Sequence, residues 1–189
     1  MTLEIVQYGD DVLLEKGKPI ENFDEELKLL FEDMVETMIE ANGIGLAAQQ
    51  IGKAIQFCVV DLRDCEIDFE YKLDGTTPPV DLFMPMGMCN PKVEFIKDKK
   101  TTSYEEGCLS FAHIRGDVER PDWIRCEYQD VDGTPHVIEC NGLLGRCIQH
   151  EVDHLNGVLF IDRMKKKAIK KIQLAINQCK VKTLQRLKR

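Results

Sequence analysis

The stretch Gln149-His150-Glu151-Val152-Asp153-His154-Leu155 predicts the central element of this chain. Two histidines four residues apart lie on one face of an α-helix, so both imidazoles can reach a single metal ion. The glutamate between them can act as general base to a water molecule on that ion. In a strand the same residues would lie too far apart. A helix is also favoured by Asn141 as N-cap, by the helical spacing of Leu144, Cys147, Ile148 and Glu151, and by a stop signal at Asn156-Gly157. A chance occurrence of the motif on a solvated helix is the alternative.

A catalytic site of this kind needs a third protein ligand. No histidine follows His154, and the only acid after it is Asp162. A protease with a glutamate as third ligand is therefore excluded, and one with an aspartate ligand requires Asp162. Upstream, Cys108 follows a glycine in Glu105-Glu106-Gly107-Cys108-Leu109-Ser110 and offers a thiolate that zinc or ferrous iron accepts. Its plainer interpretation is one more buried thiol among eight cysteines.

A third segment, Gly43-Ile44-Gly45-Leu46-Ala47-Ala48-Gln49-Gln50, is rich in small residues. It satisfies the loose pattern G-x-G-x-x-A, but it follows a predicted helix where a dinucleotide-binding loop would follow a strand. No Lys-Ser/Thr pair comes after it, so a nucleotide phosphate loop is not supported either. The plain interpretation is a helix C-cap with closely packed small residues, in which Gly43 caps the preceding helix.

Together these three segments resemble the signature motifs of peptide deformylases, in the order and at roughly the spacing of that family. The resemblance extends over most of the chain and includes Tyr8-Gly9-Asp10 and Asn90-Pro91-Lys92. It implies an α+β fold, with antiparallel sheets around a central metal-binding helix, an N-terminal helix and a C-terminal helix. The activity that it implies is metal-dependent hydrolysis of the N-formyl group from the formyl-methionine of newly made polypeptides, with release of formate.

The resemblance also implies roles for individual residues. Cys108, His150 and His154 would bind one divalent metal ion, ferrous iron natively, with zinc or nickel as substitutes in preparations. Glu151 would be the catalytic acid/base, and the Gln50 side chain and the Leu109 backbone N–H would donate to the developing oxyanion. The substrate-binding residues would be Gly43, Gly45, Glu106, Arg146 and Cys147.

Some polar residues near the motifs have plainer interpretations. Arg115 and Arg146 could steer a peptide backbone, but surface solvation is the plain expectation for each. Asp153 either orients a ligand or pairs with a nearby arginine, or is an ordinary polar helix residue. His113 and His136 have no metal-ligand partner at a suitable spacing, and we expect both to be non-catalytic.

Hydrophobic periodicity predicts the other elements. A helix is expected from about Asn22 to Ala41, with a capping box of Asn22 and Glu25 and an apolar stripe of Leu27, Leu30, Met34 and Met38. Strands are expected at Gln56–Asp61, Lys92–Lys97, Trp123–Gln129 and His136–Cys140, with a hairpin turn at Asp132-Gly133 between the last two. Glycine and prolines interrupt residues 64–88, for which we expect a plain surface loop in preference to an ordered flap.

Length and composition fit a single domain, residues 1–189. No apolar run is long enough to span a membrane, and Met1-Thr2-Leu3-Glu4 does not begin a signal peptide. Eight cysteines without a C-x-x-C pair indicate reduced thiols in a cytosol of the bacterial type. An organelle origin, with a transit peptide already removed, stays open.

The charge is unevenly distributed along the chain. The net charge is −8, yet residues 163–189 hold eleven Lys/Arg and no acid, which leaves −19 on residues 1–162. This tail is predicted to form an amphipathic helix with Ile169, Ile172, Ile176 and Cys179 on one side. Its basic face is either simply solvated or a surface that docks on ribosomal RNA. Two other functions stay open: a zinc protease that uses Asp162, and a non-catalytic metal-binding or ribosome-associated protein.

Overall fold

The helix that carries the histidine motif, α2 (Gly142–Leu155), lies at the centre of the computed structural model, which describes residues 1–66, 68–96 and 100–188. Leu144, Ile148 and Leu155 are fully buried on one of its faces, where burial of each stabilises the fold by about 1.5–3 kcal/mol. The helix ends as expected at Asn156-Gly157, where Gly157 has a φ of +70°. Asn141 is the N-cap residue, but its side chain accepts the N–H of Glu70 and not a helical N–H.

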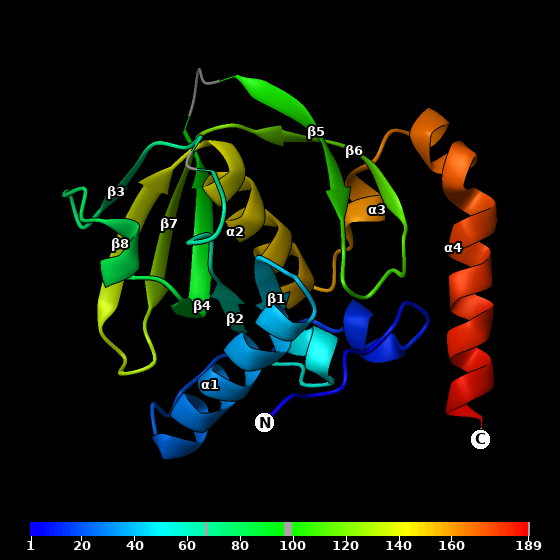
Figure 1. Cartoon of the computed structure of the whole chain (residues 1–189), viewed down its shortest axis with the longest axis horizontal. Coiled ribbons are helices and arrows are strands. Elements are labelled where there is room, and N and C mark those ends of the chain that lie inside the picture. Colours follow the sequence, from blue (N-terminus) through cyan, green and yellow to red (C-terminus); the bar gives the residue numbers. More distant parts are fainter. Residues whose placement is uncertain (67, 97–99, 189) are drawn as a thin grey trace.

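A six-stranded antiparallel sheet packs against α2 (Figure 1). Its spatial order is β1-β2-β4-β7-β8-β3. The strands are β1 (Gly45–Ala47), β2 (Phe57–Val60), β3 (Tyr71–Leu73), β4 (Met86–Phe95), β7 (Ile124–Gln129) and β8 (Pro135–Cys140). The four expected strands are thus present, and Gly133, with a φ of +82°, forms the expected turn between β7 and β8. β4 begins earlier than predicted, and Lys97 lies outside the described residues.

The segment 64–88 is not the plain surface loop that we expected. It contains β3, a 3-10 turn at Val80–Leu82 and the first residues of β4. Phe69, Met84 and Met86 from this segment are buried in the main core beside α2. The prolines and glycine hide this pattern in the sequence, because they interrupt the periodicity without preventing the apolar residues between them from packing.

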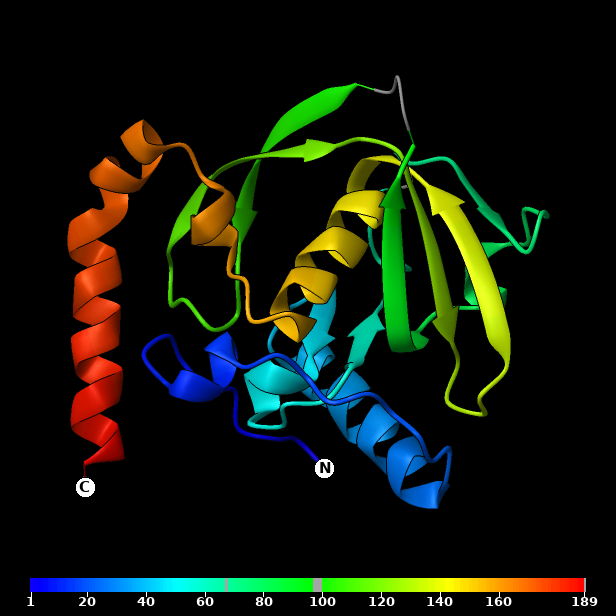
Figure 2. The ribbon, with the colours of Figure 1, turned by 180° about the vertical axis from the view of Figure 1, so that it is seen from behind.

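A separate two-stranded ribbon crosses the other side of α2 (Figures 1 and 2). It consists of β5 (Thr101–Gly107) and β6 (Arg115–Pro121), and the sequence did not predict it. Alternate residues of a ribbon share one face. The buried positions on this ribbon are Glu106, Val118 and Arg120, so the buried face is largely charged and lacks the apolar alternation that indicates a strand.

Helix α1 (Glu25–Glu40) covers the sheet near β1 and β2. Leu27, Met34 and Met38 of the expected stripe are buried there. The predicted N-cap at Asn22 was wrong by two residues, because the N-cap is Asp24, whose carboxylate accepts the N–H of Leu27 at 3.1 Å. The helix closes with an N–H of Gly43 bonded to the carbonyl of Met38 at 2.9 Å, in agreement with a capping role for Gly43.

The short helix α3 (Phe160–Arg163) and the long helix α4 (Lys166–Leu187) follow α2. As predicted, Ile169, Ile172, Ile176 and Cys179 pack on one side of α4 against a second apolar cluster that includes Phe111, Val118 and Phe160. The basic helix lies along one edge of the molecule, away from the six-stranded sheet (Figures 1 and 2). No helix in the described part of the chain has the length and apolar character that crossing a membrane requires.

Candidate metal centre and catalytic pocket

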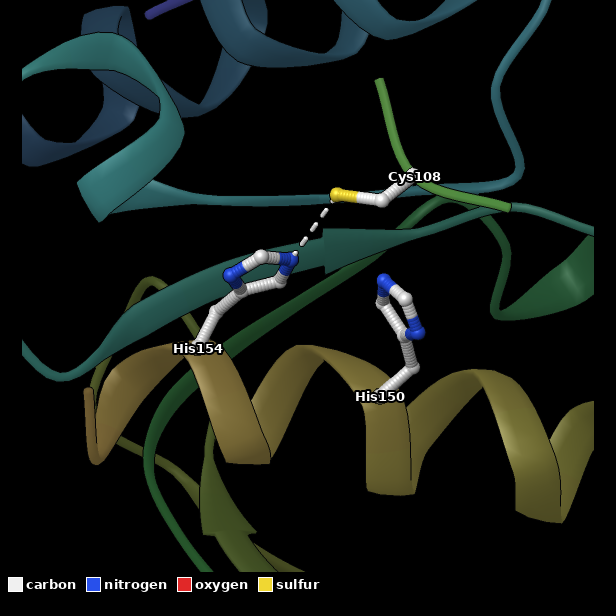
Figure 3. Close-up of side chains that lie close together, drawn as sticks. All are labelled: Cys108, His150 and His154. Atoms are coloured by element: carbon white, nitrogen blue, oxygen red, sulfur yellow. Dashed lines mark hydrogen bonds between the residues drawn. The ribbon is translucent and has the colours of Figure 1, made fainter. Parts of the chain in front are cut away.

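Cys108, His150 and His154 come together although they are far apart in the sequence (Figure 3). The two histidines lie one turn apart on α2, and Cys108 follows the last residue of β5. Their candidate ligand atoms all lie within 4.8 Å of one another, and the Cys108 Sγ is 3.3 Å from Nε2 of His154. Within residues 1–66, 68–96 and 100–188 no other group of three such side chains is this close.

The donor set fits a resident divalent metal ion. A thiolate with two imidazoles suits zinc and ferrous iron alike. Burial and the neighbouring His150 lower the pKa of His154, which keeps this imidazole in the neutral form that binds metals. His150 uses Nδ1 to contact Glu106, at 3.0 Å from Oε2, so its Nε2 is free to face Cys108 and His154. The donor set therefore indicates a site for one divalent transition-metal ion.

Asp162, the alternative third ligand, does not join this group. Its carboxylate accepts the backbone N–H of Leu159 at 2.9 Å and caps α3. The zinc protease that depended on Asp162 therefore has no support in the described residues.

Glu151 lies beside the metal ligands in a closely packed environment. Its side chain is buried, and its Oε2 has no hydrogen-bond partner among the described residues. Burial raises the pKa of Glu151 to about 7, against the opposing charges of His150 and Arg120. A carboxyl group with a pKa near neutrality suits both acceptance and return of a proton. Gly45 makes room for it, because a Cβ on Gly45 would lie 2.3 Å from Oε1 of Glu151.

Gln50 is oriented by its own carbonyl oxygen. Its Oε1 accepts the N–H of Ala47 at 2.8 Å, which turns the amide NH₂ toward the site. There Nε2 lies 3.5 Å from the Cys108 Sγ and 3.3 Å from the Ser110 Oγ. Gln50 is thus a neutral donor held at the metal centre, where its position is fixed before any substrate arrives.

The backbone around Leu109 is also held in place. The Leu109 carbonyl accepts a hydrogen bond from the Gln7 side chain at 3.1 Å, and the Ser110 carbonyl accepts the N–H of Tyr8 at 2.8 Å. The N-terminal segment therefore fixes the chain that follows Cys108. The Tyr8-Gly9-Asp10 stretch thus contributes to the position of the residues after Cys108.

Glu106 and Arg146 form a buried charged cluster with Arg120. Arg120 donates to both oxygens of Glu106, at 2.6 and 3.0 Å, and Arg146 donates to Oε1 at 2.8 Å. Burial would raise the pKa of Glu106, but hydrogen bonds from His150 and Arg120 outweigh burial and hold it well below its usual range. The expectation that Arg146 is solvated at the surface was wrong. Its guanidinium is buried and also bonds Thr102 and the carbonyl of Val118.

Other polar residues have structural partners. Asp153 binds Arg120 and Arg163, which agrees with the expected pairing to an arginine. Arg115 pairs with Glu105 on the exposed side of the ribbon. His136 bridges the carboxylates of Asp74 and Asp130 on the surface, at 2.7 and 3.2 Å. Sequence reasoning missed Arg120. It lies in β6, a strand that was not predicted, and nothing in the sequence around it indicated that this arginine is buried.

A cavity of about 650 Å³ opens onto the metal centre. All five residues expected to bind substrate line it: Gly43, Gly45, Glu106, Arg146 and Cys147. Leu143, Tyr104, Phe111 and His113 line it as well, and sequence reasoning did not assign them to the site. Leu143 lies one turn before Cys147 on α2, so helical spacing from the motif could have identified it.

Known proteins match the chain over nearly its whole length. Residues 2–170 match the family model described as polypeptide deformylase. A peptide deformylase from Opitutus terrae is 62% identical over 169 residues, which are 88% of this chain and 87% of the relative. One from Brucella suis is 43% identical over 157 residues, which are 83% of this chain and 81% of the relative.

Solved structures agree with these relatives. Peptide deformylase 1B from Arabidopsis thaliana, in complex with an inhibitor, superposes with a TM-score of 0.84 at 34% identity, over 97% of this chain and 93% of the other. A Synechococcus elongatus peptide deformylase in complex with actinonin gives 0.75 at 36% identity, over 96% and 85%. The match in sequence and in fold leads to one conclusion: the chain belongs to the polypeptide deformylase family.

Proposed function

We propose that this chain removes the N-formyl group from the formyl-methionine at the start of newly made polypeptides. One observation carries the proposal: the Cys108, His150 and His154 donors converge at a cavity where Glu151 and Gln50 are already in place. In the reaction, water adds to the formyl carbon, the C–N bond breaks, and formate and a free amino terminus leave. A non-catalytic binding protein would not need a buried carboxyl group poised beside the metal ligands.

Cys108, His150 and His154 would hold one divalent metal ion. When bound, such an ion supplies Lewis acidity toward the formyl oxygen and lowers the pKa of water. We infer ferrous iron as the native metal from the family, with zinc or nickel as substitutes. An oxidisable thiolate ligand would then make the enzyme sensitive to air. Metal analysis of protein purified without oxygen, compared with protein purified in air, tests this assignment.

Glu151 would accept the proton of the attacking water and pass it to the departing amine. Its pKa of about 7 lets it do both near neutral pH. Gln50 Nε2 and the Leu109 N–H would donate to the oxygen that becomes negatively charged. Gln50 suits this role because its amide is already oriented by the bond to Ala47, so little reorganisation is needed as charge develops.

The cavity would hold the formyl-methionyl end of the peptide. Gly43 and Gly45 present backbone at its wall, and Cys147 presents a small apolar side chain. Glu106 and Arg146 would contribute to the wall chiefly by their mutual ion pair, because their charged atoms are already bonded to each other. We propose a contact with substrate for all five residues, with Gly45 closest to the chemistry.

The experiment is formate release from a short formyl-methionyl peptide by protein purified without oxygen. A Glu151→Gln variant keeps the size of the side chain and removes its ability to take a proton. Its rate should fall about 10²-fold or more, while its metal content stays equal to that of the wild type. Folded, metal-loaded wild type that releases no formate would contradict the proposal and favour a binding protein.

We also propose that α4 docks on ribosomal RNA. Its charged side chains are all lysines or arginines, and it exposes Leu174, Val181 and Leu187 to solvent. Such a cluster binds phosphates by release of counterions. Docking would place the enzyme in the bacterial-type cytosol where formylated chains emerge, and the eight free thiols of the chain fit a reducing compartment.

Charge reversal tests the docking without removing the helix. Truncation after Lys165 would remove α4 and uncover the apolar cluster around Phe111, Val118 and Phe160 on which it packs. The triple variant Lys167→Glu, Lys170→Glu, Lys171→Glu, at three exposed positions, is therefore the sharper choice. It should lose salt-sensitive ribosome binding and keep formate release from a short peptide. Reversal of the exposed Lys72 and Lys92 on the sheet is the matched control. Unchanged ribosome affinity in the triple variant would contradict the idea.

A further inference from the structure

A line of alternating charges runs from α3 to the metal ligand His150. It begins at Arg163, the last residue of α3, whose side chain is 48% exposed. Arg163 donates to both oxygens of Asp153, with Nη2 at 2.6 Å from Oδ1 and Nε at 3.1 Å from Oδ2. Such a two-point contact restrains the carboxylate in orientation as well as in charge.

The restrained carboxylate of Asp153 in turn contacts Arg120 in the ribbon. Its Oδ2 accepts a bond from Nη1 of Arg120 at 2.8 Å, and the Arg120 side chain is only 5% exposed. Arg120 uses its other two nitrogens, Nε and Nη2, to donate to the two oxygens of Glu106. The Oε2 atom of Glu106 then faces Nδ1 of His150 at 3.0 Å. Three elements, α3, α2 and the ribbon, are therefore joined by a single continuous set of ion pairs.

The far end of this line matters for metal binding. The partner of the second ring nitrogen sets the orientation and basicity of a histidine ligand, and loss of such a partner typically costs about 10–100-fold in metal affinity or activity. Arg120 holds Glu106 by both oxygens, including the Oε2 that contacts His150, whereas Arg146 contacts Oε1 alone. Arg120 in turn contacts Asp153, whose buried carboxylate is held from its other side by the half-exposed Arg163.

We propose that Arg163 is a positioning residue for His150, acting through Asp153, Arg120 and Glu106. The proposal rests on the metal site of the proposed function. Arg163 does not line the catalytic cavity in the described part of the chain, so it has no direct contact with substrate there. Arg163 would make the metal centre more rigid. It also connects that centre to the segment that leads into α4.

The test compares Arg163→Met with Lys165→Met, both loaded with Co²⁺. Lys165 is the matched control, because it lies two residues away and also makes an ion pair, with Glu119, outside the line. Release of Co²⁺ to a chelator and the absorption bands of the thiolate-bound ion are measured. Arg163→Met should release the ion about 3–10-fold faster, less than the loss of a direct partner of the ligand, and shift the bands. Arg163→Lys should fall between it and the wild type.

Equal rates of Co²⁺ release from Arg163→Met and Lys165→Met would overturn the proposal, because loss of any positive charge near the start of α4 would then have the same effect. The path is tested by repeating Arg163→Met in a Glu106→Gln background, or in Asp153→Asn if that protein does not fold. The effect of Arg163→Met should vanish there, whereas an undiminished effect would contradict the path. These readouts need no substrate, so a wild type that fails to release formate would refute the proposed function and leave this comparison valid.

Discussion

Replacement of Gly45 by alanine should impair catalysis much more than folding. The added Cβ would lie 2.3 Å from Oε1 of Glu151 and 2.9 Å from the Sγ of Cys147. Carbon atoms normally approach other heavy atoms to about 3.5 Å, so the carboxylate must move by roughly 1 Å. A misplacement of about 1 Å can cost about 10²-fold in rate, and overpacking costs about 1–3 kcal/mol of stability. We therefore expect kcat to fall about 10²-fold in a protein that still folds.

The assay is steady-state formate release, with metal content and thermal unfolding measured on the same samples. Gly43→Ala is the matched control, because Gly43 lines the same cavity but its added Cβ would meet the flexible end of the Leu109 side chain at 2.8 Å. That variant should lose less than about 10-fold, since Leu109 Cδ1 can rotate away. A Gly45→Ala enzyme with full kcat and normal metal content would refute the reasoning that Glu151 needs this space.

Three further outcomes follow from the contacts described above. Gln50→Leu should lower kcat about 10²–10³-fold with little change in metal content, measured by formate release, because one oxyanion donor is lost. Arg146→Met should lower the free energy of unfolding by about 2 kcal/mol in urea titrations, since it leaves buried partners unpaired. His136→Gln should be less stable than the wild type chiefly between about pH 4 and 6.5. Burial lowers the pKa of His136, but its two carboxylate partners outweigh burial and raise it, so its contribution is lost as pH rises through that raised pKa. Burial raises the pKa of both carboxyls, but hydrogen bonds outweigh it and lower the pKa, from His136 and the Val137 N–H at Asp74 and from the Thr134 N–H and His136 at Asp130. The stability that the pairing contributes is therefore lost again as pH falls through those lowered values. A pH-independent difference in urea midpoints would contradict this last expectation.

The sequence predicted that His150 and His154 come together with Cys108, because the spacing of the two histidines decides which helical face they share. A four-residue separation places His150 and His154 on one helical face wherever the helix lies. The Cys108 segment could be proposed as the third ligand because the downstream chain offers only Asp162. Likewise the apolar stripe of α1 and the sheet strands with β-type periodicity were predicted correctly, apart from their ends.

The parts that escaped prediction are those where charged residues are buried. The β5–β6 ribbon presents Glu106 and Arg120 inward, so hydrophobic periodicity carries no sign of it. Arg146 was expected at the surface because an isolated arginine is usually solvated. Its place one turn before His150 is the only local sign that it shares the ligand face. Only the fold reveals that these charges neutralise one another.

Helix α2 brings the two halves of the site together by using two of its faces. Leu144 and Ile148 pack against the sheet, where Gly45 meets Glu151. His150 faces Glu106 in strand β5, which Cys108 follows. An apolar contact between ribbon and helix could stabilise the fold as well or better, because buried ion pairs lose much of their attraction to desolvation. It could not supply an acceptor for the second nitrogen of His150. The charged interior of the ribbon is therefore better explained by orientation of the metal ligand than by stability.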